Sequence, residues 1–185
     1  MNRGSHLPAP LAWIDAITER LGKALAWLVM AMMLIQFLVV VLRYVFNFNS
    51  IPVQESVMYM HAVLFMLAAS FTLKHDGHVR VDIFYRNFSP RKQAWIDLLG
   101  TLLLLIPFMS FVILTSLGYV GKSWSILEGS PDTGGIPAVF LLKTLIPLFA
   151  GLMIVQGIAE IIRKALVIAG RIPPQPEHDH TEERV

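Results

Sequence analysis

Side chains that could carry out chemistry are scarce in the apolar parts of this sequence. The chain contains no cysteine, which excludes thiol nucleophiles, disulfide bonds and cysteine-based metal sites. Within the long apolar stretches, the few polar side chains include Gln36, His61 and scattered serines and threonines. Paired carboxylates, a glycine-rich phosphate loop and zinc-ligand spacing are all missing from the sequence. We therefore expect neither an enzyme nor a bound cofactor.

His61 is the one histidine inside an apolar stretch, and ligation of a haem iron is the chemistry it could support. A membrane cytochrome needs axial histidines at membrane depth, and no second apolar stretch supplies a partner histidine. A single histidine in a spanning helix more often forms a hydrogen bond to a neighbouring helix. Independent transport is also disfavoured, because transporters place ionisable groups or broken helices near the midplane of the membrane.

Long apolar segments must position these few polar residues. A helix that crosses a bilayer needs ~20 mostly apolar residues. The chain of 185 residues is 55% hydrophobic and only 15% charged, and its mean hydropathy is +0.61. Soluble domains are about 25% charged. The sequence therefore predicts an all-α integral membrane protein with four transmembrane helices, at about 24–46, 53–73, 92–121 and 138–163.

The two ends of the chain differ from the spans. Leucine and isoleucine recur at helical spacing from Leu11 to Leu21, which predicts an N-terminal amphipathic helix. This helix either lies in the membrane interface or continues into the first span as a cytoplasmic extension. Residues 171–185 are polar and contain three prolines and three glutamates, which predicts a disordered cytoplasmic tail. The four-helix membrane domain would then cover 1–170.

The basic residues predict how the helices are oriented. Twelve of the 15 lysines and arginines lie before the first span, between the second and third spans, or after the fourth span. The other three lie in the loops on the opposite side. Cytoplasmic loops carry the excess of lysine and arginine, so both chain ends are predicted to be cytoplasmic. Membrane topology also accounts for the basic pI of about 9.0, without a nucleic-acid partner.

Several charged residues stand at the ends of the first two spans. Arg43 ends the first span and Glu55 begins the second, so the two could pair across the short outer loop. We favour such a staple of the helical hairpin over a ligand site. In the inner loop, His78, Arg80 and Asp82 alternate with apolar residues. That pattern suits either an extended segment with one face on the membrane or a partner, or a solvated loop.

Four more residues belong to the candidate assembly or structural set. Trp124 opens an outer loop that is rich in glycine and proline, and Glu128 lies within this loop. Lys143 immediately precedes the apolar part of the fourth span, and Gln156 lies within that span. Glu128, Lys143 and Gln156 are either packing and capping groups or contacts with a partner protein.

Short motifs along the chain resemble one known family. In this order and on four spans, they are similar to the small permease subunit, of DctQ type, of tripartite ATP-independent periplasmic (TRAP) transporters. The resemblance covers roughly 11–163. The motifs are LRYVF at 42–46, VQE at 53–55, DGHVRVDI at 76–83, SW at 123–124, EGS at 128–130, GIP at 135–137, LK at 142–143, IP at 146–147 and QG at 156–157.

The resemblance implies a role in the bacterial inner membrane. Such systems use a sodium gradient to import organic acids that a periplasmic solute-binding protein delivers. A large permease subunit of DctM type carries the ion and substrate sites. The small subunit scaffolds the large one in the lipid bilayer and contributes to the surface on which the binding protein docks.

Two other interpretations compete with this one. Four helices of this length also suit the membrane anchor subunit of a redox complex, in which His61 would be the sole candidate ligand. The third interpretation is a small transporter that assembles with itself. It would require an essential polar group inside the membrane.

Overall fold

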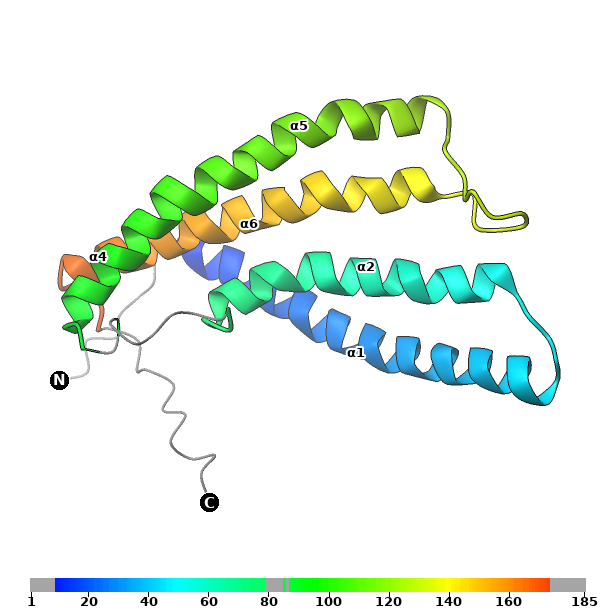
Figure 1. Ribbon diagram of the computed structural model, residues 1–185. Helices are drawn as coiled ribbons and strands as arrows, with labels where there is room; N and C mark the ends of the chain where they lie inside the picture. Colours follow the sequence, from blue (N-terminus) through cyan, green and yellow to red (C-terminus); the bar gives the residue numbers. More distant parts are fainter. Residues whose placement is uncertain (1–8, 79–84, 86, 174–185) are drawn as a thin grey trace, which may run out of the picture.

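The computed structural model describes residues 9–78, 85 and 87–173 of the chain. The described part is helical and contains no strand. Its helices form two antiparallel hairpins that lie side by side, α1–α2 and α5–α6 (Figure 1). Their bounds are α1 Ala9–Val45, α2 Ile51–Lys74, α4 Pro90–Gly100, the π-helical segment η1 Thr101–Leu105, α5 Ile106–Ser125 and α6 Val139–Ile168.

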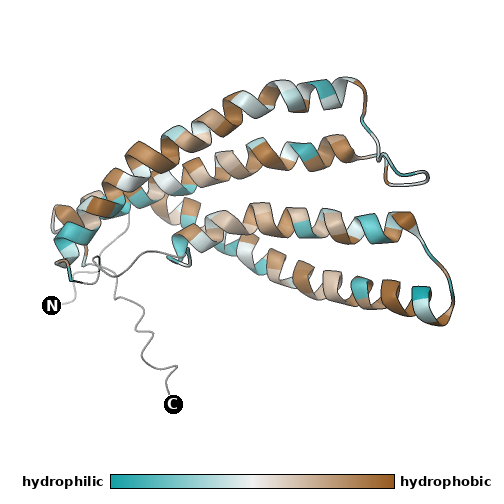
Figure 2. Ribbon diagram, in the orientation of Figure 1, coloured by the Kyte–Doolittle hydropathy of each residue, from teal (hydrophilic) through white to brown (hydrophobic). Residues whose placement is uncertain are grey.

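Four helical rods are long and apolar enough to cross a membrane, which confirms the predicted all-α membrane fold. They are Leu11–Val45, Ile51–Lys74, Pro90–Ser125 and Val139–Ile168. Figure 2 shows hydrophobic residues along the length of all four rods. The start of α1 and the end of α6 lie at the same end of the bundle (Figure 1), as an even number of spans requires. Which side of the membrane this end faces stays a prediction. Residues 174–185 of the predicted tail lie outside the described part.

The N-terminal segment is a continuous extension of the first span, which is the second of the two alternatives that the sequence left open. Helix α1 runs for 37 residues without interruption. Leu11, Thr18 and Leu25 are its buried positions, spaced seven residues apart, and they face the rest of the bundle. Trp13 remains 69% exposed. Contacts with α2 and α6 therefore hold this segment as part of the bundle.

The third rod changes its hydrogen-bond pattern just ahead of Pro107. A proline within a helix lacks an N–H donor, and its ring collides with the carbonyl four residues earlier. The π-helical segment η1 lies at this point, and the N–H of Ile106 bonds to the carbonyl of Thr101. A π-helical turn takes up one extra residue and relieves the collision. The rod therefore continues past the proline as one bowed helix (Figure 1).

Helix α6 is the central helix of the bundle, since it contacts α1, α2, α4, η1 and α5. Its buried positions include small residues such as Ala150, Gly157 and Ala159. A Cβ atom at Gly157 would lie 2.9 Å from Leu105 of η1, so the glycine permits close approach there. Small residues at contacts let membrane helices pack closely.

Candidate functional site: two polar clusters at the ends of the bundle

Arg163 is the centre of a buried group of charges where the chain ends lie. Its Nη2 atom donates to both carboxylate oxygens of Asp15, at 2.9 and 2.8 Å, and its Nη1 atom donates to Glu160. Arg163 is only 5% exposed and Glu160 only 7%. Hydrogen bonds between charged groups are stronger than those between neutral groups. This contact joins the start of α1 to the last turns of α6.

Gln156 lies one helical turn from Glu160, on the same buried face of α6. The hydroxyl of Thr18 in α1 donates to Oε1 of Gln156 at 3.0 Å. The two residues are 6% and 1% exposed, so this hydrogen bond is shielded from solvent. The Nε2 atom of Gln156 has no partner within the described part of the chain. The structure thus places the predicted Gln156 in a contact between α1 and α6.

Two lysines form further ion pairs at the same end of the bundle. Lys74, the last residue of α2, contacts Glu19 at 2.9 Å and the carbonyl of Asp15 at 3.1 Å. Lys164 of α6 contacts Asp97 of α4 at 2.6 Å. We call this group the terminal cluster, and it comprises Asp15, Thr18, Glu19, Lys74, Asp97, Gln156, Glu160, Arg163 and Lys164. It ties α2 to α1, and it ties α1 and α4 to the central helix α6.

Glu55 opens the second group, at the opposite end of the bundle. Its Oε2 atom accepts a hydrogen bond from the N–H of Ile136 at 2.5 Å, and its Oε1 atom accepts one from the hydroxyl of Ser130. A Cβ atom at position 135 would lie 2.7 Å from Oε1 of Glu55, so this close approach depends on Gly135. The carboxylate of α2 therefore holds the loop between α5 and α6.

The expected pair of Arg43 with Glu55 is wrong. Among the ion pairs of the described residues, none joins the two, and Arg43 is exposed at the end of α1. The physical reason is that the loop between α5 and α6 places the N–H of Ile136 and the hydroxyl of Ser130 beside Glu55. Both are donors that a half-buried carboxylate needs. The staple at Glu55 thus joins the two hairpins rather than the two helices of the first hairpin.

Trp124, Glu128 and Lys143 come together around the same loop. The Nζ atom of Lys143 lies 2.5 Å from the Glu128 carboxylate and 4.1 Å from the centre of the Tyr119 ring. The hydrogen bond from Lys143 holds the pKa of Glu128 below its ordinary value. The indole Nε1 atom of Trp124 donates to Thr144 at 2.8 Å. We call these residues the loop cluster, comprising Glu55, Tyr119, Trp124, Glu128, Ser130, Gly135, Ile136, Lys143 and Thr144.

The structure gathers some of the predicted residues and leaves others apart. Arg43 and His78 are both exposed and belong to neither cluster. Arg80 and Asp82 lie outside the described residues. The sequence interpretation missed Asp15 and Arg163, because it assigned the basic residues to topology. The spacing of Glu160 and Arg163, three residues apart on one helix, is the signal that could have revealed part of the terminal cluster.

The chemistry of both clusters is that of helix attachment. In the terminal and loop clusters, the charged groups are paired within the chain. No group of three or more histidines or carboxylates in the described part could hold a metal ion. These features define a multi-pass membrane protein that is held together by polar contacts at both ends of its helices.

Comparison with known proteins places the chain in a family. Residues 32–166 match the family of tripartite ATP-independent periplasmic transporters, DctQ component, and the chain belongs to it. The C4-dicarboxylate TRAP transporter small permease protein DctQ of Vibrio cholerae serotype O1 is 30% identical over 105 residues. The match covers 57% of this chain and 44% of that protein, so it spans less than half of the relative. No solved structure matches.

Family membership decides between the competing interpretations. The DctQ component is part of a transporter, which favours a transport subunit over the membrane anchor of a redox complex. With four spanning helices, the chain is a multi-pass protein of the bacterial inner membrane.

Proposed function

We propose that this chain scaffolds the large, DctM-type permease subunit of a sodium-coupled transporter that imports organic acids. The observation that carries the proposal is the internal pairing of charged groups in both polar clusters. A transporter that binds its own substrate places ionisable or broken-helix sites near the midplane. Here the charged contacts hold helices together at the two ends, as a scaffold requires.

The loop cluster supports a second part of this function. With both chain ends in the cytoplasm, as the basic residues predict, the loop of residues 126–138 faces the periplasm. Contacts with Glu55 and Lys143 fix the shape of this loop. A fixed loop offers a surface on which a periplasmic solute-binding protein can dock at low entropic cost.

Affinity purification from native membranes in mild detergent tests the scaffold role. Mass spectrometry should identify a large polytopic permease as the stable partner. Liposomes that contain only this chain should show no solute uptake. Recovery of the chain without a permease, or uptake by these liposomes, would overturn the proposal.

A further inference from the structure

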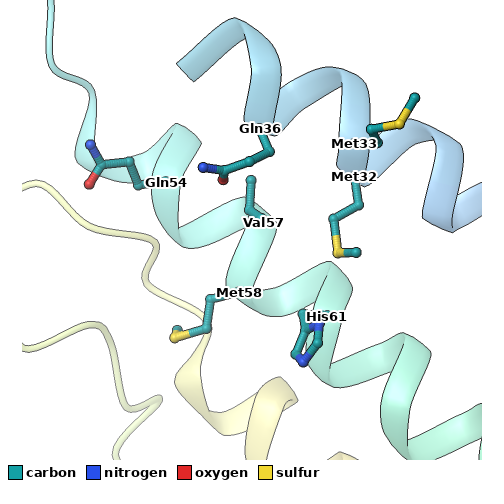
Figure 3. A pocket seen from close by; sticks show the side chains of 7 residues that line it. All are labelled: Met32, Met33, Gln36, Gln54, Val57, Met58 and His61. Atoms are coloured by element: carbon teal, nitrogen blue, oxygen red, sulfur yellow. The ribbon is translucent and has the colours of Figure 1, made fainter. Parts of the chain in front are cut away.

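A groove between α1 and α2 contains two polar residues of the apolar spans, Gln36 and His61. Its volume is about 490 Å³, and the remaining lining residues are Met32, Met33, Gln54, Val57 and Met58. Figure 3 shows Met32 and Gln36 on the side of α1 that faces α2, and Val57, Met58 and His61 along α2. Neither cluster includes this groove.

Gln36 and His61 lie inside the predicted hydrocarbon layer, away from the lipid headgroups. Gln36 precedes Arg43 by seven residues and His61 follows Glu55 by six, which places both about 10 Å inside the span ends at a rise of 1.5 Å per residue. The hydrocarbon layer is about 30 Å thick. Both side chains are exposed, and neither has a hydrogen-bond partner in the described part of the chain.

Hydrocarbon is a poor occupant for this groove. Lipid tails offer no hydrogen bonds, and a polar group without a partner is costly in the membrane. A helix that carries hydroxyl or amide side chains at the same depth would offer hydrogen-bond partners to both residues. The methionines suit such an occupant, because their flexible thioether side chains adapt to a packed surface.

We infer that this groove receives a transmembrane helix of the large permease subunit, which presents hydrogen-bonding side chains to Gln36 and His61. The inference rests on the proposed scaffold function and adds the surface through which it acts. Because this chain contains no cysteine, a single reactive position can be introduced into it without labelling elsewhere in the chain.

Photocrosslinking tests the inference in the assembled transporter. A benzophenone label attached to the cysteine of Met58→Cys lies in the groove. The same label attached to Leu114→Cys lies on α5, where Leu114 is 73% exposed. The label at position 58 should crosslink to a spanning segment of the large subunit, and the label at position 114 should not. Crosslinks from position 58 to lipid alone or to a second copy of this chain would overturn the inference, as would equal yields from both positions.

A pair of apolar substitutions tests the chemistry. Gln36→Leu with His61→Leu should reduce co-purification of the large subunit, by roughly threefold for each hydrogen bond and about tenfold together. The control, Phe37→Leu, changes a neighbouring residue that is 68% exposed and should leave the yield unchanged. An unchanged yield for the double variant would contradict the hydrogen bonds. If that variant does not fold, the crosslinks still decide.

The two proposals fail in different ways. If the unaltered chain recovers no permease, the scaffold function fails and the groove inference fails with it. If the permease is recovered but position 58 does not crosslink to it, only the groove inference fails.

Discussion

At the scale of single residues, the terminal cluster depends on Arg163. One guanidinium serves two carboxylates that come from helices far apart in the sequence, Asp15 of α1 and Glu160 of α6. Removing one partner of a buried ion pair leaves an uncompensated charge, which costs more than the pair itself contributes. The ion pairs of Arg163 therefore fix one arrangement of α1 and α6, and they add little net stability compared with apolar packing.

Arg163→Ala should lower the free energy of unfolding by about 3–5 kcal/mol, because the buried Glu160 and the half-buried Asp15 would be left without a cation. Denaturation of the purified protein in detergent measures this loss. Arg171→Ala is the matched control, since Arg171 is exposed beyond the end of α6. Equal losses for both variants would show that Arg163 acts only through net charge.

The loop cluster should respond to acid through Glu128. Lys143 lowers the pKa of this carboxyl in the folded protein, so its contribution to stability is fully present above the ordinary glutamate pKa of about 4.3. The contribution is lost as the pH falls through the lower, folded-state pKa. The protection factors of residues 126–138, which correct exchange rates for their intrinsic pH dependence, should therefore be unchanged between pH 7 and 5 and should fall in more acidic buffer. Glu128→Gln should remove this change at acidic pH. A pH profile identical to that of the unaltered protein would exclude Glu128 as its source.

At the scale of elements, the two helical hairpins are joined at both ends. The terminal cluster joins α1 to α6, and Glu55 joins α2 to the loop between α5 and α6. Between these points, close packing on the small residues of α6 holds the helices together. A hairpin that is fixed at both ends cannot rotate against its neighbour without breaking charged contacts.

Glu55→Ala should release the loop of residues 126–138 from α2. A hydrogen bond to a charged group contributes about 1.5–3 kcal/mol, so exchange of the Ile136 amide should become roughly 10- to 100-fold faster. Arg43→Ala is the control that separates the two interpretations of Glu55, since Arg43 does not pair with it in the described structure. Faster exchange in Arg43→Ala would restore the first interpretation, in which the two residues staple the first hairpin.

At the scale of the whole molecule, the protein is a bundle whose polar contacts lie at the ends and whose outer surface is apolar. Large hydrophobic side chains such as Trp27, Phe65 and Leu114 are 73% exposed or more. In water such a surface would aggregate, whereas in a bilayer it meets lipid or another membrane protein. The central helix α6 contributes much of the buried surface, so the outer helices are available for a partner.

Cysteine labelling should establish the orientation of this bundle. Asp132→Cys, in the exposed loop after α5, should react with a membrane-impermeant thiol reagent applied to intact spheroplasts. His78→Cys, exposed after α2, should react only after the membrane is permeabilised. The reverse pattern would place both chain ends outside the cytoplasm and would remove the loop cluster from the periplasmic side.

The sequence by itself determined the four spanning helices and the family resemblance. Hydropathy and short motifs are local properties, and a bilayer makes the length of an apolar run decisive. Only the tertiary structure decided the partners of the charged residues, because Asp15 and Arg163 are separated by 148 positions and no local pattern links them. The same holds for Glu55. Its nearest charged neighbour along the chain is Arg43, which suggested a pair that the structure does not contain among the described residues. Its actual partners, Ser130 and Ile136, reach it only after α5 and α6 fold back beside α2.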